Sequence, residues 1–165
     1  MIYIAIDSDL SGAVAAIDDA AQLILVADLP VVRIGRLAWV DSSALTDLLI
    51  SARNGRPARI AVERSPARPT QGVSSAFTAG CVLGSILAAC QRIAAPLDLV
   101  VPAAWKSNMG FTPQATWSLH KSAFLDSARL QFPTARLHRR KHHRRAQALL
   151  LAEYSRRQWV GKAVA

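Results

Sequence analysis

The sequence predicts a mixed α/β fold with a central sheet and helices on both of its faces. Three observations predict it: a continuous apolar run at residues 2–7, two further apolar runs after short turns, and a later strand-like run at residues 58–63 that follows a helical pattern. Continuous apolar runs are typical of strands buried on both faces. Strands that alternate with amphipathic helices in this way build layers around one core.

The first three strands are predicted to form an antiparallel meander. The second and third apolar runs span residues 13–18 and 22–29, and only short turns separate the three runs. Short turns join antiparallel neighbours. Pro30 ends the third strand, because proline has no amide hydrogen to give to a sheet. Residues 31–40 fit neither a helix nor a strand clearly.

A helical crossover leads to the fourth strand. Asp41 or Ser42 is a suitable N-cap for a helix that extends to about Arg53, where an Asn-Gly pair stops it. Residues 58–63 form the next strand, and a right-handed crossover places it parallel to the first strand.

A long apolar helix is predicted over residues 73–94. Residues 73–90 are apolar enough to suggest a membrane span, but they contain four Ser and Thr residues and have polar neighbours, so a buried core helix is preferred. Gly80, Gly84 and Ala88 form a stripe of small residues at four-residue spacing. The stripe permits close approach either to the sheet or to a partner chain, and the sheet is the preferred alternative.

The last third of the chain is predicted to be mainly helical. Residues 97–101 form a fifth strand that Pro102 ends, and helices follow at 103–109, 115–131 and about 144–158. At 165 residues the chain has the size of one domain with a substantial core.

The chain is strongly basic, with a formal net charge of +9. Much of the excess lies within ten residues, at Arg136, Arg139, Arg140, Lys141, Arg144 and Arg145. Clusters of this kind attract polyanions, chiefly nucleic acid. A merely solvated surface is the alternative, and it suits scattered charges better than this cluster.

The two cysteines and the N-terminus indicate the compartment. Cys81 and Cys90 match neither a metal-ligand spacing nor a disulfide scaffold, so both are expected to be buried thiols in a reducing environment. The N-terminus passes directly into a strand, without a signal peptide. We therefore expect a cytoplasmic protein with no membrane association and no small-molecule cofactor.

Two of the predicted strands end in acids, Asp7 and Glu63. Adjacent strands lie about 4.8 Å apart, so the two carboxylates can share one cation or bridge two. Without a metal they would repel each other and raise one pKa. Oxygen ligands suit Mg²⁺, and a pair of such ions is a common device for phosphodiester hydrolysis. The alternative is that each acid pairs with an arginine such as Arg64, which fits two acids beside a basic segment less well.

The last predicted helix carries further candidates for this site. His143 and Gln147 are four residues apart and share a helix face. His143 could bind a metal or transfer a proton, and Gln147 could offer a neutral carbonyl oxygen. Alternatively, His142 and His143 belong to a basic run that contacts phosphates.

Together these stretches resemble the RuvC-like Holliday-junction resolvases of the RNase H-like nuclease superfamily, and most closely their phage and chloroplast branch. The matching stretches span nearly the whole chain in family order, at 4–13, 61–64, 80–88, 101–106 and 145–152. The resemblance implies a bacterial or phage-encoded protein with one nuclease domain over residues 1–165. It also implies an RNase H-like five-stranded sheet in the order 3-2-1-4-5, with strand 2 antiparallel and helices on both faces.

The resemblance implies a homodimer that binds four-way DNA junctions and nicks them symmetrically with two Mg²⁺ or Mn²⁺ ions per site. Asp7 and Glu63 would be metal ligands, and Gln147 would stand at a third ligand position. Lys106 falls where such proteins have a basic residue near the scissile phosphate. His143 occupies a position that is often His or Asp. The implied catalytic set is therefore Asp7, Glu63, Lys106, His143 and Gln147.

The last motif departs from the family pattern. Related sequences typically read Lys-Asp-His-Gly-Arg-Ala-Glu-Ala, and here His142, Arg144 and Gln147 stand for the Asp, Gly and Glu. Glutamine is isosteric with glutamate but neutral, so it should weaken metal binding without disturbing the fold. Arg144 adds positive charge near the site. We expect cleavage to be impaired, and a non-cleaving junction-binding protein or another RNase H-like nuclease are the alternatives.

Candidate DNA contacts are mostly basic and would act on phosphates, so binding should depend steeply on salt. They are Arg64, Arg68, Gln71, Lys106, Lys121, Arg139, Arg140, Lys141 and Arg145. An aromatic side chain in a loop could stack on an unpaired base at the junction centre, and Phe77 and Phe111 are the candidates. For each of them a position in the core is the alternative, and it is the more common one for phenylalanine.

Overall fold

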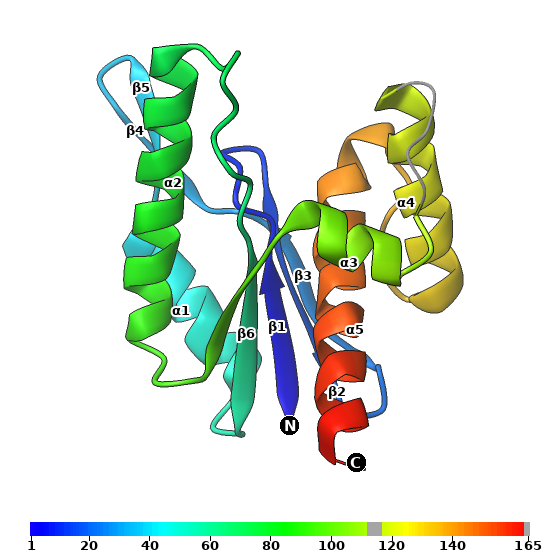
Figure 1. The fold of residues 1–165 in the computed structure, drawn as a ribbon. Coiled ribbons are helices and arrows are strands. Elements are labelled where there is room, and N and C mark those ends of the chain that lie inside the picture. Colours follow the sequence, from blue (N-terminus) through cyan, green and yellow to red (C-terminus); the bar gives the residue numbers. More distant parts are fainter. Residues whose placement is uncertain (112–116, 164–165) are drawn as a thin grey trace.

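The computed structural model describes the backbone of residues 1–111 and 117–163, and the side chains of residues 1–111, 119 and 121–160. Its centre is a five-stranded sheet in the order β3-β2-β1-β6-β7 (Figure 1). The strands are β1 Ile2–Ile6, β2 Ala13–Asp18, β3 Leu23–Asp28, β6 Ala58–Glu63 and β7 Leu97–Val100. β2 is antiparallel to β1 and β3, whereas β6 and β7 run parallel to β1. The predicted order and strand directions are therefore confirmed.

Helices cover both faces of this sheet, as predicted (Figure 1). They are α1 Ser42–Arg53, α2 Val73–Gln91, α3 Pro102–Asn108, α4 Trp117–Gln131 and α5 His143–Ala163, with a 3₁₀ turn, η1 Arg140–His142, before α5. Asp41 caps α1, and Asn54, in the left-handed conformation, ends it. The predicted start of α4 at residue 115 lies outside the described residues. α5 is longer than predicted at both ends.

β1 is buried on both faces because its side chains alternate between two apolar clusters. Ile2, Ile4 and Ile6 pack with α1 and α2, whereas Tyr3 and Ala5 pack with α4 and α5. Alternation of this kind is the ordinary geometry of a strand. Asp7 directly follows this fully packed strand, and its side chain is therefore buried.

Residues 31–40 form a hairpin of their own. β4 Val31–Ile34 and β5 Leu37–Val40 pair antiparallel in a separate two-stranded sheet. Gly35 turns the chain between them with a φ of +62°, which glycine adopts without steric cost. The segment was ambiguous in the sequence because all four residues of β4 are exposed, so its apolar pattern has no buried face.

Two predictions for α2 are wrong. Its buried residues are Val82, Ile86, Ala89 and Cys90, whereas the small-residue stripe is exposed to solvent and does not face the sheet. Larger side chains gain more free energy from burial than glycine does, so they take the inner face. The helix is therefore not a fully buried core helix, and Cys81, unlike Cys90, is only half-buried.

The length and composition of α2 are also sufficient for a membrane span, with a mean hydropathy of 1.8. A core helix of a soluble protein passes the same test, but such a helix is mostly buried, whereas only 22% of this window is buried. Here its buried face joins the cluster that β1 and α1 form on one side of the sheet.

The turn after β1 is closed by backbone contacts that hold Asp7 in place. The Asp7 amide donates to the Ala13 carbonyl at 2.9 Å, and the Gly12 amide donates to the Asp9 carbonyl at 2.8 Å. A Cβ atom on Gly12 would lie 2.0 Å from the Asp7 carbonyl oxygen and 2.7 Å from that of Asp9. Only glycine fits here without moving the backbone that carries Asp7.

This close approach predicts that Gly12→Ala lowers the free energy of unfolding by about 2–4 kcal/mol, as a steric clash with backbone atoms does. Gly80→Ala is the matched control, because a Cβ atom there meets nothing within 4 Å, and it should not lower the free energy of unfolding, since alanine suits a helix interior better than glycine does. Urea denaturation followed by circular dichroism measures both. Equal losses in the two variants would contradict the constraint.

Candidate functional site

Asp7 and Glu63 lie next to each other at the end of the two central parallel strands. Ile6 is paired with Val62 in the β1–β6 register, so the acids are the next residues along adjacent strands. Their exposed fractions are only 3% and 6%. The structure thus brings these two predicted site residues together at one buried edge of the sheet.

The carboxylate of Glu63 is held by α3. The indole Nε1 of Trp105 donates a buried hydrogen bond of 2.7 Å to Glu63 Oε2, and Lys106 Nζ lies 3.9 Å from Oε1. α3 begins at Pro102, shortly after the end of β7, so Trp105 and Lys106 lie at the same edge of the sheet as Glu63. Lys106 was predicted here. The role of Trp105 was not, although its position directly before Lys106 was a usable signal.

The carboxylate of Asp7 is held by an arginine at the start of α5. Arg144 Nη1 lies 3.2 Å from Asp7 Oδ2 and 3.5 Å from Oδ1, and Nη2 donates to Asp9 Oδ2 at 2.9 Å. One guanidinium therefore spans two acids of the β1–β2 turn. The sequence placed Arg144 near the site but gave no sign that it pairs with Asp7, and it did not single out Asp9.

The environment of Asp7 opposes its ionisation. Burial raises the pKa of Asp7 from 3.8 to about 7. Arg144 lowers the pKa by stabilising the anion, whereas the negative charges of Glu63 and Asp9 raise it further. Even with Arg144 beside it, the pKa of Asp7 therefore stays well above that of an exposed aspartate.

α5 also supplies Gln147 and His143. Gln147 is 1% exposed, and neither polar atom of its side chain has a hydrogen-bond partner. It lies three residues beyond Arg144, on the same side of the helix. His143 is half-buried, with Nδ1 3.2 Å from the Arg140 carbonyl oxygen, and burial lowers the pKa of its ring.

These residues include oxygen donors of the kind that a divalent ion needs. The carboxylates of Asp7 and Glu63 fit Mg²⁺ or Mn²⁺, and the unpaired Gln147 amide offers a neutral oxygen. Among the described residues there is no group of three or more His, Cys, Asp and Glu side chains that could hold a metal. The set therefore fits a divalent ion with two acidic ligands, provided that the Arg144 guanidinium leaves Asp7.

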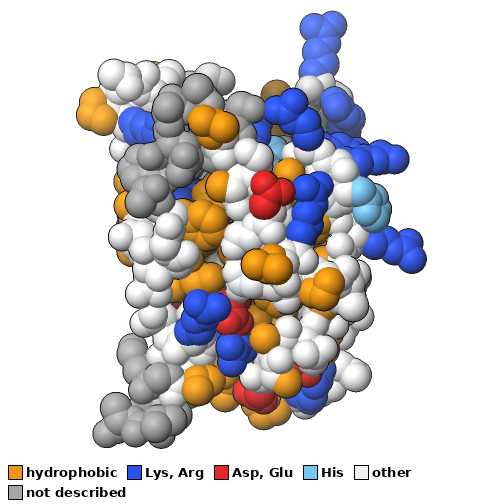
Figure 2. All heavy atoms as spheres, turned by 90° about the vertical axis from the view of Figure 1, so that its right-hand side faces the viewer, with side chains coloured by type: hydrophobic (Ala, Val, Ile, Leu, Met, Phe, Trp, Pro, Cys, Tyr) orange, Lys and Arg blue, Asp and Glu red, His pale blue; other side chains and the backbone are white. Residues whose placement is uncertain are grey.

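Exposed basic residues lie on two segments near this edge. Arg64 and Arg68 are on the loop after β6, and Arg139, Arg140 and Lys141 precede α5. Figure 2 shows Lys and Arg side chains gathered along one edge of the face that carries α4 and α5.

The remaining predicted DNA contacts differ in accessibility. Gln71 is half-buried and accepts from the Arg68 amide at 3.3 Å, and Lys121 is also half-buried. Arg145 is already paired with Asp28 through hydrogen bonds of 2.6 and 2.8 Å. A phosphate would therefore have to compete with Asp28 for Arg145.

The two aromatic candidates for stacking on a base are now distinguishable. Phe77 is 67% exposed, near the N-terminus of α2. Phe111 packs edge-on against Phe124 with ring centroids 4.8 Å apart, and it also contacts Trp105. Phe111 is partly buried and packs against the core, so of the two alternatives for this residue the structure favours core packing.

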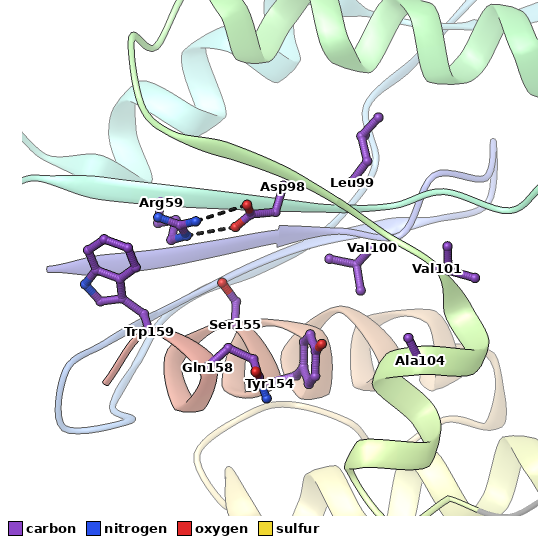
Figure 3. Close-up of a pocket in the computed structure, with 10 residues that line it drawn as sticks. All are labelled: Arg59, Asp98, Leu99, Val100, Val101, Ala104, Tyr154, Ser155, Gln158 and Trp159. Carbon is purple, nitrogen blue, oxygen red and sulfur yellow. Dashed lines mark hydrogen bonds and ion pairs between the residues drawn. The ribbon is translucent and has the colours of Figure 1, made fainter. Parts of the chain in front are cut away.

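A cavity of about 370 Å³ lies between β7 and the C-terminal half of α5, and neither acid of the pair lines it (Figure 3). Arg59 makes a bidentate ion pair with Asp98 in its wall, at 2.8 and 3.0 Å, and its guanidinium lies 4.3 Å from the Trp159 ring centroid. None of its ten lining residues is a predicted site residue.

The chain is similar in structure to the RuvC protein of Thermus thermophilus. One structure is described as T. thermophilus RuvC in complex with a Holliday junction substrate. It aligns with a TM-score of 0.65 and 18% identity, over 98% of this chain and 96% of that one. A second Thermus thermophilus RuvC structure aligns with a TM-score of 0.57 and 17% identity, over 98% and 97%. No family model matches the sequence, and no curated protein matches it.

The raised pKa of Asp7 predicts a specific dependence of stability on pH. The folded chain binds a proton at Asp7 more tightly than the unfolded chain does, so the Asp7 contribution to the free energy of unfolding falls as pH rises from about 4 through about 7. Asp7→Asn cannot ionise. Relative to wild type it should gain roughly 2–3 kcal/mol between pH 5 and pH 8.

Urea denaturation in buffers that contain EDTA measures this difference without interference from metal. Asp47→Asn, at an exposed position of α1, controls for the loss of one carboxylate. A constant difference between wild type and Asp7→Asn over this pH range would show that the Asp7 carboxylate is not strained by burial.

Proposed function

Because the chain has a RuvC-like fold, we propose that it is a structure-specific DNA endonuclease that binds four-way junctions as a homodimer and nicks them symmetrically with Mg²⁺ or Mn²⁺. The observation that carries the proposal is the buried pair of Asp7 and Glu63 on adjacent parallel strand ends. A junction substrate is also what the structurally similar T. thermophilus RuvC is described as binding.

Asp7, Glu63 and the Gln147 amide oxygen would hold the metal. A divalent ion at such a site supplies a more acidic bound water and stabilises the charge on the leaving oxygen. Trp105 fixes the orientation of Glu63 through its 2.7 Å hydrogen bond. Lys106, beside Glu63, presents a positive charge for the scissile phosphate. Burial keeps the His143 ring neutral near pH 7, so that ring can accept a proton.

The basic segments on either side of the acid pair support DNA as the partner. The loop that carries Arg64 and Arg68 follows β6 directly, and the segment that carries Arg139–Lys141 leads into α5, so both adjoin elements that provide site residues. Contacts of this kind neutralise phosphates and release counterions, which makes binding strongly dependent on salt. Phe77 is placed to stack on an unpaired base.

An exposed apolar surface supports a second copy of the chain as the other partner. On α2 it comprises Val73 together with the exposed stripe of Gly80, Gly84 and Ala88. The β4–β5 hairpin packs against α2 and adds Val31, Ile34 and Leu37, each at least 49% exposed. Contiguous exposed apolar surfaces mark interaction sites, and small residues allow two helices to approach closely.

One specific pair of observations favours a second candidate, a junction-binding protein that cleaves little or not at all. Arg144 forms an ion pair with the Asp7 carboxylate. Gln147 provides a neutral amide at the position where the family resemblance predicts an acid. Both features reduce the negative charge available to a metal. DNA recognition through the exposed basic residues does not depend on either.

Three labelled substrates separate these functions: a mobile four-way junction, a linear duplex and an RNA–DNA hybrid, each with and without Mn²⁺. Paired symmetric nicks in the junction alone are the expected result, and they should disappear in Asp7→Asn. Tight junction binding without nicks, with cleavage appearing in Gln147→Glu, would favour the second candidate. Degradation of the hybrid or of duplex ends, or nicking by Asp7→Asn, would contradict both.

The proposed dimer predicts that Gly84→Arg produces a monomer, since a long charged side chain prevents close approach of two α2 helices. Sedimentation velocity measures the association state. Ser51→Arg, which adds the same charge at an exposed position of α1, should sediment as wild type does. If Gly84→Arg and wild type have the same mass in solution, this surface is not the dimer interface.

A further inference from the structure

Arg144 lies where a bound cation would lie. Its two terminal nitrogens reach different acids, with Nη1 3.2 Å from Asp7 Oδ2 and Nη2 2.9 Å from Asp9 Oδ2. Asp9 is itself held, because its other oxygen accepts from the Ser11 amide and hydroxyl at 3.0 and 3.1 Å. The guanidinium therefore bridges Asp9, which the turn holds in place, and the buried Asp7.

Each acid of the central pair already has a cation of its own. Glu63 has Lys106 at 3.9 Å and Asp7 has Arg144 at 3.2 Å, so the two charges that would bind a metal are compensated by the protein. Charge-assisted hydrogen bonds from a guanidinium to a carboxylate are among the stronger polar contacts in proteins. A divalent ion that uses Asp7 must first break such a contact.

The position of Arg144 allows this exchange. Its side chain is 21% exposed, whereas that of Asp7 is 4% exposed, so the guanidinium closes the outer side of the buried carboxylate. Asp9 lies further out, with its side chain 48% exposed. Arg144 can therefore swing away from Asp7 towards solvent, whereas Asp7 itself is fixed by the turn at Gly12.

We propose that Arg144 is a resident cation that competes with the divalent metal for Asp7. This inference rests on the metal site of the proposed function. In the metal-free protein Arg144 holds a charge-assisted contact to the buried carboxylate of Asp7, and its displacement is the step that opens the site. The metal affinity of the wild-type protein is consequently held below the affinity that its oxygen donors would give by themselves.

Titration with Mn²⁺ in the absence of DNA, with free Mn²⁺ followed by electron paramagnetic resonance, tests the competition without an activity assay. Arg144→Ala should bind Mn²⁺ at least about tenfold more tightly than wild type, because a charge-assisted hydrogen bond no longer opposes the metal. Arg144→Gln, which keeps a polar side chain of similar reach, should show the same gain if the alanine variant is poorly folded by circular dichroism.

Arg145→Ala is the matched control. It removes the same charge from the next residue, but Arg145 pairs with Asp28 and not with the acids of the site. Its Mn²⁺ affinity should stay within about twofold of wild type. Adding Asp7→Asn to Arg144→Ala should abolish the gain, and a gain that persists in this double variant would overturn the proposal.

Two other outcomes separate this inference from the function on which it rests. Equal Mn²⁺ affinity in wild type, Arg144→Ala and Arg144→Gln would overturn the competition and leave the metal site standing. Failure of all three proteins to bind Mn²⁺ would overturn the competition together with metal-dependent cleavage. Binding to the labelled junction, measured separately, would in that case still decide whether the chain is a junction-binding protein.

Discussion

The carboxylate of Asp7 is the constraint on which the site depends. Asp7 directly follows a strand that is packed on both faces, and its carboxylate lies beside that of a second buried acid, Glu63. A buried charge is costly unless a counter-charge or hydrogen bonds compensate for it. The neighbouring elements supply this compensation: α3 brings Trp105 and Lys106 to Glu63, and α5 brings Arg144 to Asp7.

Much of the fold was predictable because burial on both faces leaves a continuous apolar run in the sequence. β1 and β6 have such runs, and their shared direction places Asp7 beside Glu63. The hairpin at residues 31–40 was not predictable, since β4 is exposed along its whole length. The orientation of α2 was predicted wrongly, because small residues at four-residue spacing suit an inner or an outer face equally well.

The pairing of Arg144 with Asp7 joins residues 137 positions apart, and no local pattern encodes it. It depends on where the first turn of α5 lies relative to the β1–β2 turn. The same limit applies to Trp105 and Glu63. Likewise, the sequence left Phe111 open between core packing and base stacking, because its partners, Trp105 and Phe124, lie on two other helices. Sequence reasoning located the acids and Lys106, but it did not identify Trp105 as a partner of Glu63 or Arg144 as the partner of Asp7.

If the proposed function holds, compensation of the acids by the protein itself would link the metal to DNA. The backbone of a nucleic acid would bring negative charge to the edge where Lys106 and Arg144 lie. A phosphate that attracts Arg144 away from Asp7 would leave this carboxylate without its cation and so favour a divalent ion in its place. By thermodynamic linkage, a metal that displaces Arg144 would strengthen phosphate binding by the same factor. A site with this arrangement would take up its metal most readily when substrate is present, and the proposed phosphodiester chemistry would then be restricted to DNA that has already docked.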